Sequence, residues 1–187
     1  MIDEYVGAYA RGMSSLDRNE FSKAIDVIMK AAFFKKNIWV AGNGGSAAIS
    51  EHLCCDFMKG TKAQGHHRLK PISMSSNLPL ITAIANDISY EDTISFQVDG
   101  LMEGNDVLIL ISSSGNSPNI VKAAQAAKDI GTIIGLTGFS GGKLMEMADI
   151  KLHIPINNYG VVEDCHQSIM HLISQTIAKD RGVHVSF

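Results

Sequence analysis

Short apolar segments that alternate with longer helical patterns constrain the fold of this chain more than any other feature. The clearest strand is predicted at 106–112, where five consecutive apolar residues precede a run of serines. Further strands are predicted at 37–42 and 132–138, with helices at 46–60 and 118–130. Strands that alternate with helices pair in parallel through right-handed crossovers. The sequence therefore predicts the α/β class: a three-layer α/β/α sandwich with a mainly parallel, doubly wound sheet.

The remaining segments extend this pattern without an internal repeat, linker or low-complexity stretch. The other predicted elements are strands at 70–75 and 149–155 and helices at 3–13, 17–35, 78–87 and 161–180. Asp17 is placed to cap the second of these helices. The two leading helices, within residues 1–35, have no strand partners, so we expect them to form an oligomerisation surface. We predict a single domain over residues 1–187.

Charge and cysteine content exclude several classes of protein. The net charge is −3 and the pI is about 6.1, so there is no bulk attraction to nucleic acid or to anionic membranes. The first 21 residues contain acids and no apolar core, unlike a signal peptide, and no apolar run is long enough to span a bilayer. The cysteines at positions 54, 55 and 165 show no zinc or redox spacing. We expect reduced thiols and a cytoplasmic location, with no nucleic-acid or membrane partner.

Two strand-to-helix turns have an unusual chemistry. The first reads GNGGSA at 42–47 and the second SSSGNS at 112–117. Glycine amides, serine hydroxyls and the N-termini of the following helices together suit a phosphate dianion. No lysine follows the glycines and G-x-G-x-x-G is absent, so neither a Walker loop nor a nucleotide cofactor is indicated. An uncharged cradle favours a phosphate that stays attached to its substrate. The simpler alternative is that Ser114 or Ser117 only caps a helix and the glycines only serve the turn.

Two predicted helices carry ionisable side chains on one face. His52 and Asp56 are four residues apart in the first, and Glu163, Gln167 and His171 follow the same spacing in the last. Such a group of imidazoles and carboxylates suits either a metal site or an acid–base site. A His-x-x-x-Asp pair alone is a weak signal, because each histidine is more often an ordinary surface or core residue.

The motifs resemble those of sugar isomerase (SIS) domains. The GNGGSA loop, AND at 85–87, the SSSGNS loop and LTG at 136–138 occur in the family's order, and the similarity covers essentially the whole chain. Within that family the chain is most similar to the phosphoheptose isomerases. The resemblance implies a phosphate held by Ser112, Ser113, Ser114 and Ser117. It also implies substrate contacts from Asn43, Gly44, Gly45, Asn86, Asp87, Asp56 and Glu163.

The resemblance further implies an enzyme that interconverts sedoheptulose 7-phosphate and a heptose 7-phosphate through an enediol, for lipopolysaccharide or capsule heptose synthesis. Asp56 and His171 would be the acid–base pair. Zinc or another divalent metal, one per site, would be bound by His52, Asp56, Glu163 and His171. The family forms homotetramers with sites shared between subunits, and we expect the same here.

Two positions depart from the family's pattern. Asp56 replaces a glutamate and has a shorter reach, and Glu163 replaces a glutamine and adds a negative charge. The family's arginine after the first site helix has no match, and Lys59 is the nearest cation. His166, three residues after Glu163, is placed to join the rim of the site.

Two alternatives belong to other functional classes. A non-catalytic SIS module would bind a protein partner, as the DnaA-initiator-associating relatives do, or would sense a sugar phosphate. The retention of ionisable residues at the four metal positions argues against it. A serine hydrolase is disfavoured because no histidine lies near the serine loop in the sequence.

Overall fold

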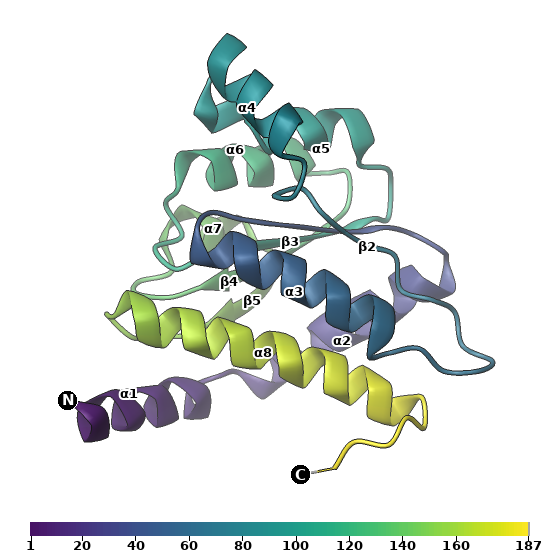
Figure 1. Ribbon diagram of the computed structural model, residues 1–187, viewed down its shortest axis with the longest axis vertical. Coiled ribbons are helices and arrows are strands. Elements are labelled where there is room, and N and C mark those ends of the chain that lie inside the picture. The colour runs from purple at the N-terminus through teal and green to yellow at the C-terminus, as the bar shows by residue number, and fades with distance from the viewer. Residues whose placement is uncertain (187) are drawn as a thin grey trace.

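A five-stranded parallel sheet forms the centre of the computed structural model, which describes residues 1–186 (Figure 1). Its strands, in chain order, are β1 (Ile38–Gly42), β2 (Pro71–Ser73), β3 (Val107–Ser112), β4 (Thr132–Thr137) and β5 (Ile150–His153). Their spatial order is β2-β1-β3-β4-β5, so the direction of winding reverses between β1 and β3. Open α/β sheets bind ligands at such a switch point, beyond the carboxyl ends of the strands. The glycine loop follows β1 and the serine loop follows β3, so the fold brings both loops to this position.

Helices cover both faces of the sheet, which confirms the predicted three-layer sandwich. The helices are α1 (Ile2–Ser14), α2 (Arg18–Phe33), α3 (Gly45–Lys59), α4 (Leu78–Asp87), α5 (Ser95–Leu101), α6 (Pro118–Ala127), α7 (Gly142–Met147) and α8 (Tyr159–Asp180), with a 3₁₀ turn, η1 (Tyr90–Asp92). On one face α2, α3 and α8 enclose one apolar cluster, and on the other α5, α6 and α7 enclose a second. In Figure 1, α3 and α8 lie side by side, and α1 runs along the outside of α8.

Strand β3 shows why an uninterrupted apolar run precedes the serine loop. Ile109 and Ile111 contribute to the cluster under α2, α3 and α8, whereas Leu108 and Leu110 contribute to the cluster under α5 and α6. All six residues of the strand are buried. A strand covered on both faces has no polar side, so its sequence does not alternate.

Several boundaries differ from those that the sequence predicts. The helix predicted at 118–130 ends at Ala127, because the chain turns through Asp129 in a left-handed conformation (φ 68°) before β4. The short helices α5 and α7 and the turn η1 were not predicted, since elements this short show no helical period in the sequence. Asp17 does cap α2, as predicted, and accepts hydrogen bonds from the backbone N–H groups of Asn19 and Glu20. Among the described residues, no helix has the length and apolar character that a bilayer span requires.

Candidate functional site

A small pocket of about 170 Å³ opens where the glycine loop and the serine loop meet. The serines of the second loop line it together with Asn43, Ser46, Tyr159 and Glu163. Its walls therefore come from three elements that are far apart in the sequence. The volume suits a phosphate-sized group, and the remainder of a larger ligand would extend out of the pocket.

The glycine loop brings the backbone of α3 to this pocket. Gly44 is the N-cap of α3 and adopts φ +52°, so no side chain caps the helix, and the N–H of Ser46 donates to the carbonyl of Asn43 instead. A Cβ atom added at Gly45 would lie 2.6 Å from Oε2 of Glu163. The carboxylate of Glu163 thus rests directly on the loop, and a side chain at position 45 would displace it.

The serine loop is not a conventional helix cap. Ser117 occupies the N-cap position of α6, yet its side chain makes no capping hydrogen bond and its Oγ lies 3.3 Å from Oγ of Ser112. Ser114 Oγ accepts a hydrogen bond from the N–H of Asn116, inside the loop. Ser113 Oγ is buried and has no hydrogen-bond partner among the described residues. The capping alternative does not account for these hydroxyls, whereas an oxygen-rich ligand would give them partners.

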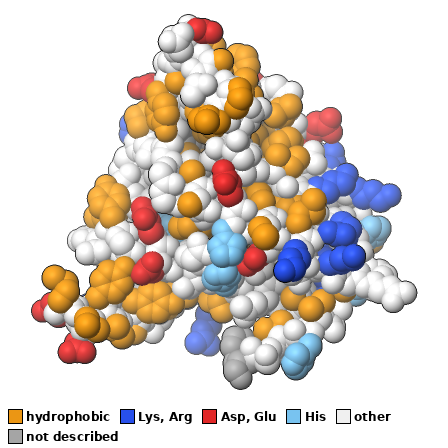
Figure 2. Space-filling model, in the orientation of Figure 1, with side chains coloured by type: hydrophobic (Ala, Val, Ile, Leu, Met, Phe, Trp, Pro, Cys, Tyr) orange, Lys and Arg blue, Asp and Glu red, His pale blue; other side chains and the backbone are white. Residues whose placement is uncertain are grey.

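A cluster of ionisable side chains lies further along α3 and α8. Nδ1 of His171 is 3.0 Å from Oδ2 of Asp56, and Nε2 of His52 is 3.6 Å from Oδ1 of the same carboxylate. The two imidazole rings meet edge to face with centroids 5.0 Å apart. Figure 2 shows histidine side chains beside an acidic one at the centre of the face over these two helices. The predicted spacing of four residues on α3 therefore does produce a joint site with α8.

Gln167 links the two histidines of this cluster. Its amide nitrogen lies 3.0 Å from Nδ1 of His52 and 3.0 Å from Nε2 of His171. The amide nitrogen of Gln167 can donate to a ring nitrogen that carries no proton, so Gln167 can bridge the two imidazoles. In that arrangement Nδ1–H of His171 can donate a hydrogen bond to the carboxylate of Asp56. The sequence placed Gln167 on the correct face between Glu163 and His171, but gave no signal that it would bridge the histidines.

Three residues of this cluster have the chemistry of a divalent metal site. His52, Asp56 and His171 each offer a ligand atom, and these atoms lie within 4.8 Å of one another. Two imidazole nitrogens and one carboxylate oxygen form a donor set that zinc commonly takes in catalytic sites, with the fourth position open. The residues present therefore fit the implied metal. Glu163 lies eight residues before His171, about 12 Å along the helix axis, and its role as a fourth ligand stays a prediction.

Other residues singled out in the sequence lie elsewhere. Asn86 and Asp87 are exposed at the end of α4, where the amide of Asn86 donates to the carboxylate of Asp87 at 2.7 Å, and neither lines the pocket. Their predicted contact with substrate remains a prediction. His166 is not at the rim: it is fully buried, because its side of α8 faces the core, and burial lowers its pKa to about 4.

A larger cavity of about 460 Å³ lies at the opposite end of the sheet. Lys30, Phe34, Asn105 and Thr132 are among the residues that line it. These residues adjoin the starts of β3 and β4, whereas ligands in such sheets bind at the strand ends. None of the predicted site residues lines this cavity.

Comparison with known proteins gives consistent results. The SIS domain family matches residues 4–138. A phosphoheptose isomerase from Helicobacter hepaticus is 37% identical over 161 residues, which are 86% of this chain and 82% of that protein. A probable phosphoheptose isomerase from Thermoplasma acidophilum is 35% identical over 179 residues, which are 93% of this chain and 96% of that protein.

Solved structures agree with the sequence relatives. The phosphoheptose isomerase of Neisseria gonorrhoeae aligns with a TM-score of 0.86 and 27% identity, over 95% of each chain. The phosphoheptose isomerase of Francisella tularensis aligns with a TM-score of 0.85 and 25% identity, over 95% of this chain and 94% of that one.

Proposed function

This chain belongs to the SIS domain family and, within it, to the phosphoheptose isomerases, and on that premise we propose that it converts sedoheptulose 7-phosphate to a heptose 7-phosphate. The chain covers most of the length of its relatives, so the similarity is not confined to a shared piece. One observation supports the proposal above all: a serine-lined pocket and a His–Asp–His cluster lie along the same two helices.

The serine pocket is the proposed phosphate site. Hydroxyls of Ser112, Ser113, Ser114 and Ser117 surround it, and two helix N-termini without side-chain caps adjoin it. Backbone amides at helix N-termini favour anions, and hydroxyls adapt their donors to phosphate oxygens. Asn43, Gly44 and Gly45 would contact the sugar next to the phosphate, with Asn86 and Asp87 proposed at the sugar hydroxyls.

The separation of the two sites agrees with a long substrate. Ser46 lines the serine pocket, and His52 and Asp56 follow on the same helix at six and ten residues, or about 9 and 15 Å along its axis. A sugar anchored by its phosphate would have to extend along α3 and α8 to bring its carbonyl to the cluster. A seven-carbon chain suits that reach better than a short one.

Asp56 and His171 are the proposed acid–base pair. Asp56 removes a proton from the carbon next to the carbonyl, which gives an enediol, and then protonates the former carbonyl carbon, while His171 carries a proton between the two substrate oxygens. The 3.0 Å contact between these groups lets each hold the other in place. A divalent ion bound by His52, Asp56 and His171, with Glu163 as the predicted fourth ligand, would polarise the carbonyl when present. The mechanism needs no nucleotide cofactor.

We further propose a homotetramer with sites shared between subunits. Apolar side chains are exposed along α1 and α8, including Ile2 (79% exposed), Val6, Tyr159 and Leu172. Figure 2 shows hydrophobic side chains gathered at the lower left of this face, over α1 and the start of α8. Burial of such a surface between copies of the chain would favour assembly. Residues 1–187 would form one domain, which would work in the cytoplasm in heptose synthesis.

A substrate panel tests the proposed function. Five-, six- and seven-carbon sugar phosphates are incubated with the protein with and without added zinc, and products are identified by NMR. We expect turnover of sedoheptulose 7-phosphate. Binding of a sugar phosphate without turnover, under all metal conditions, would favour the alternative of a non-catalytic module, for which the comparisons give no support.

A further inference from the structure

Tyr90, which is not among the predicted site residues, reaches the glycine loop from the turn that follows α4. It begins the turn η1, and its hydroxyl donates to Oδ1 of Asn43 over 2.9 Å. The two residues are 47 positions apart, so this contact depends on the tertiary fold. Asn43 lines the serine pocket, and Tyr90 does not. Tyr90 therefore acts on the pocket through Asn43.

The side-chain oxygen of Asn43 accepts hydrogen bonds from two other side chains. Asn43 and Asn119 exchange two amide hydrogen bonds, each 2.8 Å long, in which Oδ1 of Asn43 accepts one. The hydroxyl of Tyr90 donates the second bond to the same oxygen. A carbonyl oxygen has two lone pairs, so that atom has no capacity left for a ligand. The carboxamide of Asn43 can offer a ligand only its remaining N–H, which suits an acceptor oxygen of a sugar or phosphate.

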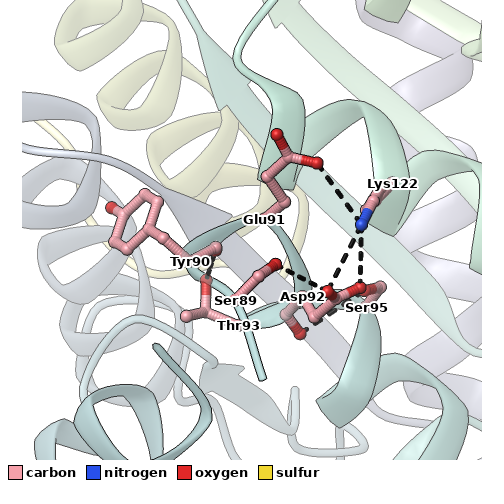
Figure 3. Close-up of polar contacts among 7 residues, drawn as sticks. All are labelled: Ser89, Tyr90, Glu91, Asp92, Thr93, Ser95 and Lys122. Carbon is pink, nitrogen blue, oxygen red and sulfur yellow. Dashed lines mark hydrogen bonds and ion pairs between the residues drawn. The ribbon is translucent and has the colours of Figure 1, made fainter. Parts of the chain in front are cut away.

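An ion-pair cluster holds η1 in place. Figure 3 shows Lys122 of α6 between Glu91 and Asp92, with the ring of Tyr90 directed away from this cluster. The ammonium of Lys122 lies 3.1 Å from Asp92 and 3.3 Å from Glu91, and Ser89 donates to Asp92 over 2.6 Å. Thr93 also donates to the carbonyl oxygen of Tyr90 over 2.8 Å. These contacts fix the backbone from which Tyr90 extends.

Helix α6 contributes both the residue that contacts Asn43 and the residue that contacts η1. Helix α6 begins directly after the serine loop, and it carries Asn119 in its first turn and Lys122 one turn later. Lys122 holds η1, η1 positions Tyr90, and Tyr90 and Asn119 converge on Asn43. Side-chain contacts thereby join the glycine loop to η1 and to the helix that follows the serine loop.

We propose that Tyr90 is a positioning residue for substrate binding, which holds the carboxamide of Asn43 so that its free N–H faces the ligand oxygen in the serine pocket. This inference rests on the proposed function in naming a sugar phosphate as the ligand. The contact between Tyr90 and Asn43 itself is present without ligand and can be tested independently.

A double-mutant cycle tests the proposal. Tyr90→Phe, Asn43→Ala and the double variant are compared for Kd of sedoheptulose 7-phosphate and for KM and kcat. We expect Tyr90→Phe to raise Kd and KM by about two- to tenfold, the usual effect of one neutral hydrogen bond, with little change in kcat. In the Asn43→Ala background the same change should have no further effect. Tyr5→Phe removes a comparable exposed hydroxyl, bonded to Asp164 instead, and should leave Kd unchanged.

A second measurement separates failure of this inference from failure of the proposed function. Side-chain amide NMR of the ligand-free protein, with the Asn43 signal identified by its loss in Asn43→Ala, should show that signal shifted and broadened in Tyr90→Phe. Equal effects of Tyr90→Phe in both backgrounds, or an unmoved Asn43 signal, would overturn the inference. If the unaltered protein binds no sugar phosphate, the proposed function fails, and the NMR result alone decides whether Tyr90 orients Asn43.

Discussion

Nδ1 of His171 lies 3.0 Å from the carboxylate of Asp56, although the two residues are 115 positions apart. This contact joins α8 to α3 at the point where His52 also approaches the same carboxylate. The resulting pair is half-exposed, so a substrate that enters along the two helices can reach it.

Substitution in the serine loop should weaken ligand binding without unfolding the protein. Ser114→Ala and Ser117→Ala each remove a hydroxyl that lines the pocket and does not cap α6. We expect each to weaken sugar-phosphate binding by roughly 1–3 kcal/mol, the value of a hydrogen bond to a charged group. Calorimetric titration measures the effect. The control is Ser22→Ala, which removes an exposed hydroxyl on α2. Unchanged affinity in both loop variants would show that the loop does not hold the phosphate.

Loss of the Gln167 bridge between the two histidines should lower the metal affinity and the activity of the site and leave the rest of the fold unaffected. Gln167→Leu removes both hydrogen bonds to the ring nitrogens while keeping a good helix former. Residues that orient metal-binding histidines typically contribute about ten- to hundredfold to metal affinity or activity, and we expect a loss in that range. ¹⁵N NMR of the imidazoles should also show that His52 and His171 lose their fixed tautomers. Gln125→Leu, on the exposed face of α6, is the matched control. Unaltered tautomers and zinc affinity in Gln167→Leu would rule out this role.

Glu163 places a negative charge in the proposed phosphate pocket, against Gly45. Glu163→Gln should tighten the binding of inorganic phosphate roughly threefold, because a solvated pair of like charges costs up to about 1 kcal/mol. Zinc affinity, measured on the same variant, decides between this position at the pocket, which leaves zinc affinity unchanged, and the predicted role as fourth metal ligand. A fall in zinc affinity would instead assign Glu163 to the metal, as the resemblance to the family implies. No change in phosphate affinity would contradict its position beside the phosphate.

His166 should make the folded protein sensitive to mild acid. Burial keeps it neutral down to a pKa of about 4, whereas an unfolded histidine is protonated near pH 6.5. As the pH falls below 6.5 the unfolded chain binds the extra proton, so the free energy of unfolding decreases, by about 3 kcal/mol by pH 4. Neither ring nitrogen has a hydrogen-bond partner among the described residues, so His166→Leu should fold and lose this component. Urea unfolding at pH 7.5 and 5.0 compares the two proteins. The same pH dependence in both would show that His166 is not its source.

The sequence predicted those parts of the fold that depend on local pattern. The apolar run of β3, its serine loop and the helix after it follow from a buried strand that ends in polar residues at a helix start. The spacing of His52 and Asp56 put both on one face of α3, because a helix repeats after about four residues. The three-layer arrangement followed from the alternation of strands and helices.

The parts that could not be predicted depend on how distant elements are placed. The bridge from Gln167 to His52 requires the register between α3 and α8, which no local spacing encodes. The bond from Tyr90 to Asn43 arises from η1, a turn too short to show a period. His166 has the same sequence signals as a rim residue, and only the packing of α8 against the sheet buries it. Asn86 and Asp87 occur in a family motif, yet lie on the exposed end of α4.

Proton exchange tests the central claim most directly. The protein is incubated with sedoheptulose 7-phosphate in D₂O. NMR then follows the incorporation of deuterium at the two carbons between which the carbonyl moves. An enediol mechanism predicts that deuterium enters the sugar as the heptose 7-phosphate forms, and that Asp56→Asn slows this entry by at least about a hundredfold, the usual contribution of a general base. Isomerisation without deuterium entry, or full exchange by Asp56→Asn, would contradict the account.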